Sequence, residues 1–187
     1  MKRLLLSFVL VLISMMSTAG ATEINAGVYP DPGGASCNIV DDQAGLLNVY
    51  VVVIAPDGAT ALQMAAPMPT CMVGATWLTD TDPFGMIIGS SQTGFAYGFG
   101  SCLTGPIHVI TISYFVQGTS EPCCMYPVYP DPSVPSGKIE VTDCNYQVVY
   151  AWGKVSSVNG DSSCPCGYPV PVERATWGAI KSLYTDR

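Results

Sequence analysis

Residues 46–58 read Leu-Leu-Asn-Val-Tyr-Val-Val-Val-Ile-Ala-Pro-Asp-Gly, and their apolar run Val49–Ala55 is the longest that follows the N-terminal segment. β-Branched side chains dominate this run and favour a strand. Apolar residues occupy both of its alternating faces, which is typical of a central strand covered on both sides. Pro56-Asp57-Gly58 then predicts a turn, because Pro presets φ and Gly accepts a positive φ. We therefore expect a strand over residues 46–55 and a partner strand over residues 60–66.

Short apolar segments separated by Gly and Pro continue along the rest of the chain. This spacing predicts an all-β, antiparallel two-sheet sandwich. The pentapeptide Val-Tyr-Pro-Asp-Pro occurs at residues 28–32 and again at 128–132, and each copy is expected to close a strand with a Pro-rich turn. Residues 117–137 contain five prolines and predict a long loop that cysteines tie down. The expected strands, about nine in number, cover residues 24–29, 46–55, 60–66, 84–89, 94–100, 107–116, 138–142, 146–152 and 154–158.

The N-terminal segment has the three parts of a secretory signal peptide. Lys2 and Arg3 supply positive charge, residues 4–16 are almost wholly apolar, and Ala19-Gly20-Ala21 offers small residues at a cleavage site. The apolar segment is shorter than the roughly 20 residues of a membrane-spanning helix. We expect residues 1–21 to be removed on export, which predicts a secreted or cell-surface protein with no membrane span in the mature chain.

Removal of the signal peptide leaves one β-sandwich domain over residues 22–170 and a C-terminal tail over residues 171–187. The whole chain of 187 residues has 7 basic and 14 acidic side chains, and Lys2 and Arg3 leave with the signal peptide. No Lys or Arg occurs between Thr22 and Gly137. Nucleic acids and anionic membrane surfaces both require cations on the protein. We therefore expect neither as a partner.

Eight cysteines follow the signal peptide. An even number in an exported chain predicts up to four disulfides, for which 105 pairings are possible. Adjacent Cys123-Cys124 fits a vicinal ring or two separate bridges, and Cys164-Pro165-Cys166 fits a redox pair or two separate bridges. We expect structural disulfides, with a thiol oxidoreductase that uses Cys164 and Cys166 as an alternative. The disulfide candidates are Cys37, Cys71, Cys102, Cys123, Cys124, Cys144, Cys164 and Cys166.

Residues for catalysis or cofactor binding are sparse. The single histidine, His108, lies within a β-branched strand, and no Gly-x-Ser-x-Gly motif or phosphate-binding glycine loop occurs. Asp41-Asp42 and Asp80-Thr81-Asp82 are the close acidic clusters, and aspartates in turns usually cap backbone amides. Asp80 and Asp82 also offer the oxygen ligands that Ca²⁺ prefers. We expect no catalytic residues, no cofactor and no metal, and thus no enzyme.

One strand presents an aromatic face. In residues 94–100, Phe95, Tyr97 and Phe99 share one side of the strand, and Gly and Ala residues share the other. The aromatic face fits two roles, since it either fills the core or stacks on the sugar rings of a polysaccharide.

The C-terminal tail changes from the period of a strand to that of a helix. Trp177, Ile180 and Tyr184 follow the i, i+3, i+7 spacing, with Glu173 early and Lys181 late, as suits the helix dipole. A helix of about three turns is marginal alone. We therefore expect this helix to dock on the domain or on a partner.

The order of the expected elements resembles that of cohesin-like and related immunoglobulin-like sandwich modules of bacterial secreted proteins. The resemblance covers residues 24–158 and rests on the strands at 46–55, 60–66 and 107–116 with the Pro-Asp-Gly turn. No functional residue is carried over from it. The apolar content, the missing cations and the tail favour a non-catalytic structural or protein-interaction module with an extracellular or cell-surface protein as partner. A carbohydrate-binding module that uses the aromatic face is the alternative.

Overall fold

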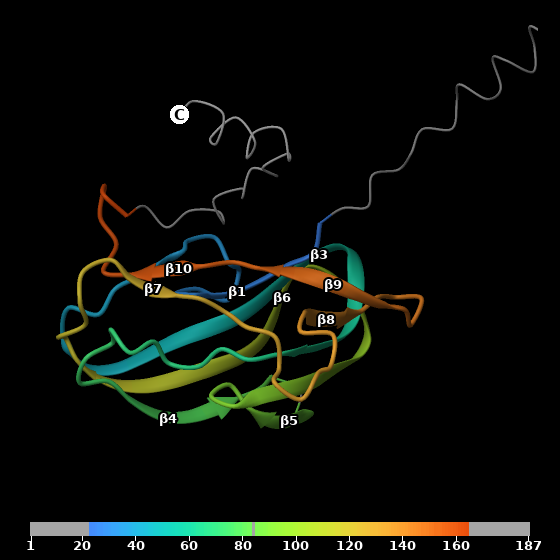
Figure 1. The fold of residues 1–187 in the computed structure, drawn as a ribbon, viewed down its shortest axis with the longest axis horizontal. Helices are drawn as coiled ribbons and strands as arrows, with labels where there is room; N and C mark the ends of the chain where they lie inside the picture. The colour runs from blue at the N-terminus through green and yellow to red at the C-terminus, as the bar shows by residue number, and fades with distance from the viewer. Residues whose placement is uncertain (1–22, 84, 165–187) are drawn as a thin grey trace, which may run out of the picture.

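The computed structural model describes residues 23–83 and 85–164, which form ten β-strands (Figure 1). In this part of the chain there is no helix that is long and apolar enough to cross a membrane. The strands are β1 (Asn25–Tyr29), β2 (Asn38–Ile39), β3 (Ala44–Met64), β4 (Thr76–Thr81), β5 (Ile87–Ser90), β6 (Gly94–Gln117), β7 (Cys124–Tyr126), β8 (Ile139–Thr142), β9 (Val148–Gly153) and β10 (Ser156–Val158).

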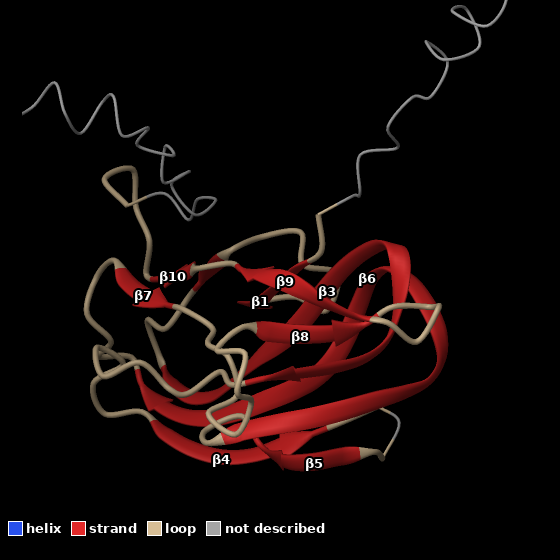
Figure 2. Cartoon of the chain, turned by 45° about the vertical axis from the view of Figure 1, so that its right-hand side comes forward, coloured by secondary structure: helices blue, strands red, loops and turns tan. Residues whose placement is uncertain are grey.

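A seven-stranded sheet forms most of the molecule, with the strand order β1-β9-β8-β3-β6-β4 and with β5 paired to β6. β3 and β6 are 21 and 24 residues long and pair with each other along most of their length. Both strands bend, so that their halves belong to two layers that face each other (Figure 2). The front layer consists of β9, β8, the second half of β3, the first half of β6, and β5. The rear layer consists of β1, the first half of β3, the second half of β6, and β4.

The predicted β-sandwich is therefore confirmed, although its sheets are mixed and not wholly antiparallel. β1 pairs in parallel with β9 and so links an edge of the rear layer to an edge of the front layer. A separate sheet with the order β2-β10-β7 includes the parallel pair of β2 and β10.

Apolar side chains from both layers fill the space between them. Val49, Val51 and Val53 of β3 are fully buried, as the alternation of the sequence predicted. They belong to one hydrophobic cluster with Leu62 and Phe95 of the front layer. The core therefore lies between the two halves of the same long strands.

A pair of buried tyrosines connects β6 to β7. The Tyr114 hydroxyl lies 2.6 Å from the Tyr126 hydroxyl, which in turn donates to the carbonyl oxygen of Ala66 at 3.2 Å. Burial raises the pKa of both hydroxyls. Each hydroxyl keeps a hydrogen-bond partner in the core, which offsets the cost of removing it from water.

The prediction of a turn at residues 56–58 is wrong, because these residues lie inside β3. The pairing of β3 with β6 shifts register between Ala55 and Ala59, and Gly58 has a φ of +92°. A Cβ at Gly58 would lie 2.8 Å from the sulfur of Cys102, so only glycine fits there. Pro and Gly thus bend the strand from one layer into the other, and both halves pair with β6 instead of with each other.

The other strand predictions agree with the structure in position, with four differences. The segments 94–100 and 107–116 belong to the single strand β6. β4 was not expected, because its sequence Thr-Trp-Leu-Thr-Asp-Thr is largely polar. In the structure most of its side chains are exposed. β7 lies within the expected loop 117–137, and the two-residue β2 was not expected either.

Both copies of Val-Tyr-Pro-Asp-Pro form the same kind of turn. The backbone N–H of Gly34 donates to the carbonyl oxygen of Asp31 at 3.2 Å, and that of Val134 donates to the carbonyl oxygen of Asp131 at 3.0 Å. The Asp31 carboxylate also accepts backbone hydrogen bonds, of which that from Ala35 contributes most to a lowered pKa of this carboxyl. The repeat is therefore a repeated turn motif.

Three disulfides lie within the described residues, and each joins segments that are distant in the sequence. Cys37 is disulfide-bonded as well, whereas Cys166 lies outside the described residues. Adjacent Cys123 and Cys124 therefore belong to separate bridges, and the vicinal ring is not formed. The bridges Cys71–Cys124, Cys102–Cys144 and Cys123–Cys164 have Cα–Cα distances of 5.5, 5.2 and 5.7 Å.

Candidate functional site

Five side chains lie in one row across the outer face of the front layer. The strand register pairs Tyr150 of β9 with Glu140 of β8, and Glu140 with Gln63 of β3. Gln63 pairs in turn with Ala96 of β6, and Ala96 with Ile88 of β5. Residues two positions apart on a strand point to the same face. The neighbouring rows therefore extend this surface on both sides.

The middle of this surface consists of small side chains. Ala61 of β3 pairs with Gly98 of β6, and Ala96 lies two residues before Gly98. Because these side chains are small, they leave an open hollow of about 340 Å³ between larger residues on either side. We call this hollow the front trough. Its floor is formed by Ala61, Gln63, Ala96, Gly98, Glu140 and Thr142.

Large apolar side chains border the front trough on both sides. On the β5 side, Met86 is exposed and Ile88 is 77% exposed. On the β9 side, Val148, Tyr150 and Trp152 occupy alternate positions of one strand, and Trp152 is 62% exposed. We call these two borders the β5 edge and the β9 edge. Grouped apolar side chains of this kind are typical of interaction surfaces, whereas single ones are ordinary.

Charge on the front trough is sparse. The carboxylate of Glu140 has no hydrogen-bond or ion-pair partner among residues 23–83 and 85–164. The ammonium of Lys138 lies 4.3 Å from the ring centroid of Tyr150, a cation–π contact. Lys138 and Lys154 are the only Lys or Arg residues between positions 23 and 164, against twelve Asp and Glu. This part of the chain is therefore acidic.

The front trough was not predicted, because its residues come from five separate strands. One sign of it was present in the sequence. Val148, Tyr150 and Trp152 alternate with Val149, Ala151 and Gly153, so that three large side chains share one face.

Of the two roles expected for Phe95, Tyr97 and Phe99, the structure shows that they fill the core, because all three side chains are buried. Phe95 and Tyr97 are 1% exposed and Phe99 is 4% exposed. The rings of Tyr97 and Phe99 lie 5.5 Å apart in the core between the layers. The alternation of the sequence groups the residues that share a face. In the structure, the Gly and Ala face of residues 94–100 points outward and contributes to the trough floor.

Aspartates of both acidic clusters accept hydrogen bonds within the fold. Asp80 accepts hydrogen bonds from the backbone N–H and the hydroxyl of Ser91, at 2.6 and 2.8 Å, and from the Trp77 indole at 3.1 Å. Asp82 accepts hydrogen bonds from the Tyr97 hydroxyl and from backbone amides. Of the other cluster, Asp41 is buried and accepts a hydrogen bond from the Ser120 hydroxyl, whereas Asp42 is exposed. Neither cluster presents two free carboxylates to a substrate or to Ca²⁺.

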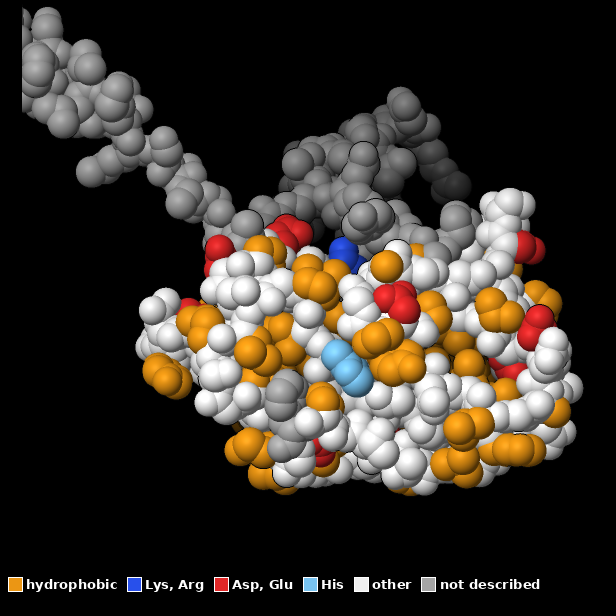
Figure 3. Space-filling view, turned by 180° about the vertical axis from the view of Figure 1, so that it is seen from behind, with side chains coloured by type: hydrophobic (Ala, Val, Ile, Leu, Met, Phe, Trp, Pro, Cys, Tyr) orange, Lys and Arg blue, Asp and Glu red, His pale blue; other side chains and the backbone are white. Residues whose placement is uncertain are grey.

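The single histidine is half-buried beside a tyrosine. Its Nε2 lies 3.0 Å from the Thr111 hydroxyl, and its ring meets the edge of the Tyr50 ring at 5.3 Å. Burial lowers the pKa of His108. The space-filling view shows uncharged side chains around the histidine on this face of the molecule (Figure 3). The structure thus gives His108 packing contacts.

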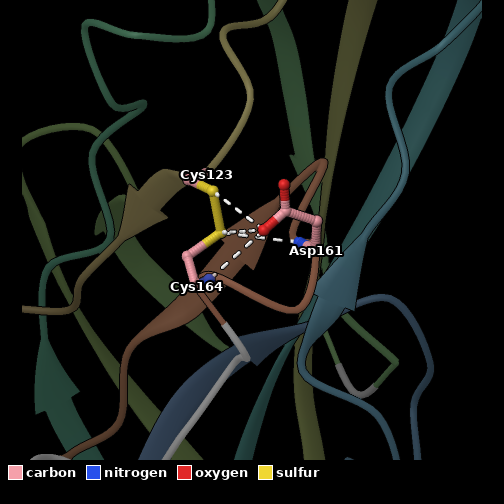
Figure 4. Close-up of side chains that lie close together, drawn as sticks. All are labelled: Cys123, Asp161 and Cys164. Carbon is pink, nitrogen blue, oxygen red and sulfur yellow. Dashed lines mark hydrogen bonds between the residues drawn. A yellow bond between two sulfur atoms is a disulfide. The ribbon is translucent and has the colours of Figure 1, made fainter.

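One cluster has the composition of a metal site. Sγ of Cys123, Sγ of Cys164 and an oxygen of Asp161 lie within 4.8 Å of one another (Figure 4). The two sulfurs form a disulfide, so they are not thiolates, which are the form that binds metal. The Asp161 carboxylate accepts hydrogen bonds from the hydroxyl and backbone N–H of Ser163, which lower the pKa of Asp161. The cluster therefore caps a turn, and Cys164 is not available for a redox pair with Cys166.

Some predicted residues lie outside the described part of the chain. These are the signal peptide at residues 1–21 and the predicted docking helix with Trp177, Ile180 and Tyr184.

No family model matches the chain, and no curated protein sequence matches it. Solved structures do match, among them the sixth cohesin of Acetivibrio cellulolyticus scaffoldin B in complex with a dockerin. It aligns with a TM-score of 0.48 and 11% identity over 75% of this chain and 100% of its own. A non-cellulosomal cohesin from Archaeoglobus fulgidus aligns with a TM-score of 0.45 and 9% identity, over 73% of this chain and 91% of its own. A type II cohesin from Acetivibrio cellulolyticus aligns with a TM-score of 0.42 and 10% identity, over 74% and 96%. All three are cohesin domains, the family that the order of the expected strands resembles.

Proposed function

We propose that the chain is a non-catalytic protein-interaction module that binds another protein on the front trough. The observation that carries this proposal is the exposure of large apolar side chains on both edges of a floor whose middle is formed by Ala61, Ala96 and Gly98. Covering such side chains with a partner stabilises a complex by roughly 25 cal/mol per Å² of apolar area. The β9 edge also contributes Tyr150 and Trp152, which are residue types that often dominate binding energy.

The dimensions of the trough suit a helix or a similar rod-shaped element. Neighbouring strands are about 4.8 Å apart. The β5 and β9 edges are four strand spacings apart, which places them about 19 Å from each other. A helix with its side chains is about 10–12 Å wide, so it fits between the edges. The unpaired carboxylate of Glu140 on the floor favours Lys or Arg in the partner.

The remaining features support an extracellular, non-catalytic role. His108, Asp80 and Asp82 are engaged in packing contacts and hydrogen bonds of the fold. The described cysteines are disulfide-bonded, and disulfides persist in oxidising compartments. Together with the predicted signal peptide, these bonds favour an extracellular or cell-surface protein as the partner.

Capture of exported proteins of the source organism on the immobilised mature chain tests this proposal. Ile88→Glu and Trp152→Ala each change one edge of the trough. Leu46→Glu is the matched control, because Leu46 is an exposed apolar residue paired with Phe115 in the rear layer. We expect a specific partner whose retention falls about tenfold or more in both edge variants and is unchanged in the control. Equal retention by the wild type and Ile88→Glu contradicts the proposal.

The β9 edge favours a second candidate function, polysaccharide binding. Tyr150 and Trp152 are exposed on the same strand and, with Lys138, line a further hollow of about 580 Å³. If these rings stack on sugars, Trp152→Ala removes the retardation of the protein in native gels that contain the polysaccharide. Ile88→Glu, at the opposite edge, leaves the retardation unchanged. Retardation that survives Trp152→Ala contradicts this second function.

A further inference from the structure

We infer that the front trough of one copy of this chain binds residues 172–187 of a second copy. The inference rests on the proposed docking role of the trough and names its partner. It connects two features of the chain. One is the exposed trough, and the other is the predicted amphipathic helix of the C-terminal tail.

The tail carries an apolar face with basic side chains beside it. Trp177, Ile180 and Tyr184 lie on one face of the predicted helix. Arg174 lies three residues before Trp177 and Lys181 four residues after it, so both are on the same side of the helix. Such a face presents large apolar groups and cations together.

The charges of the two parts of the chain are complementary. Residues 23–164 contain twelve acidic side chains and two lysines. The tail holds three basic side chains, Arg174, Lys181 and Arg187, against the two acidic ones of Glu173 and Asp186. The carboxylate of Glu140 on the trough floor has no partner among the residues that the structure describes. A basic side chain of the tail supplies that partner while its apolar neighbours cover the β5 and β9 edges.

The start of the tail lies on the side of the molecule away from the β5 edge of the trough, which favours a second copy over the same chain. A disulfide fixes Cys164 to Cys123 next to β7, on the side of the molecule away from β5 (Figures 1 and 2). Residues 165–173 span at most about 32 Å when fully extended. A domain of this size is about 37 Å across, and a path over its surface is longer. The tail therefore reaches the β5 edge of a neighbouring molecule more readily than that of its own.

Sedimentation velocity of the mature chain over a wide range of concentrations tests the inference. We expect the wild type to associate as its concentration rises. Ile88→Glu in the trough and Trp177→Ala in the tail should each weaken association about tenfold or more. Ile88 is 77% exposed, so its substitution leaves the core intact. Leu46→Glu, on the rear layer, should associate like the wild type.

A mixture of the two variants tests the inference most directly. Ile88→Glu keeps an intact tail, and Trp177→Ala keeps an intact trough, so that the mixture contains one complete contact. We expect dimers from the mixture and no larger species. Because Trp177→Ala must be folded to offer an intact trough, the result also excludes misfolding as the cause of its lost association. A mixture of the two variants that stays monomeric overturns the inference. A wild type that is monomeric at every concentration overturns it as well, and this is the result expected if the tail binds the trough of its own chain.

Failure of this inference is distinguishable from failure of the proposed function. If the chain does not associate with itself but still captures an exported partner in an Ile88-dependent manner, only the role of the tail is wrong. If Ile88→Glu changes neither association nor capture, both are wrong.

Discussion

Replacing Cys102 and Cys144 with alanine is expected to destabilise the fold by about 4 kcal/mol. The bridge joins residues that are 42 apart in the sequence. The entropy lost when the unfolded chain is closed into a loop of that length corresponds to about 4 kcal/mol at 25 °C. Cys102 is exposed and Cys144 is half-buried, so that little packing is lost with the sulfurs. For a domain of this size the melting temperature should fall by roughly 8–16 °C.

Urea unfolding followed by circular dichroism measures this loss. The matched variant lacks the bridge of Cys71 and Cys124, which are 53 residues apart and of which Cys124 is buried. Loop closure predicts a loss of about 4 kcal/mol for this variant as well. The reasoning would be refuted if the free energy of unfolding fell by less than about 1 kcal/mol without the Cys102–Cys144 bridge and fell substantially only without the Cys71–Cys124 bridge.

Tyr126→Phe is expected to cost about 1–3 kcal/mol, because the carbonyl oxygen of Ala66 and the hydroxyl of Tyr114 lose a buried partner. Urea unfolding measures this cost, and a loss no larger than that of the exposed Tyr150→Phe contradicts it. The lowered pKa of Asp31 predicts a stabilising contribution that is fully present above the ordinary carboxyl pKa of about 4 and is lost as pH falls below it. Thermal unfolding of the wild type and Asp31→Asn should therefore converge towards acid pH, and a difference that does not change with pH contradicts this assignment.

The core strands of the sandwich could be predicted because alternation is a local property of the sequence. Val49, Val51 and Val53 are buried as their spacing indicated. The edge strand β4 has no such pattern, since most of its side chains are exposed and polar. A strand at an edge is defined by its pairing with a neighbour, in this case β6, and not by its own residues.

The direction of the chain at residues 56–58 could not be predicted from those residues. Pro and Gly supply the same backbone angles whether a strand reverses or bends. The outcome depends on β6, which pairs with β3 on both sides of the bend. The same limit applies to residues 94–100, where alternation groups Phe95 with Tyr97 but does not show whether that face points inward.

The front trough depends on the register between strands that are distant in the sequence. No single segment of the sequence therefore predicts it. Tyr150, Glu140, Gln63, Ala96 and Ile88 become neighbours only when five strands pair with these partners. A shift of one residue in any of these strands would replace its trough residue with a core residue.

Hydroxyl-radical footprinting of the chain, alone at low concentration and with its bound partner, tests the docking role of the front trough most directly. Met86 and Trp152 lie on the β5 and β9 edges and are exposed. Met125 on β7 and Trp77 on β4 are exposed elsewhere, so they are internal controls of the same residue types. We predict that the partner lowers the oxidation of Met86 and Trp152 and leaves that of Met125 and Trp77 unchanged. Protection of Met125 or Trp77, with Met86 and Trp152 still oxidised, would contradict the assignment of the trough as the docking face.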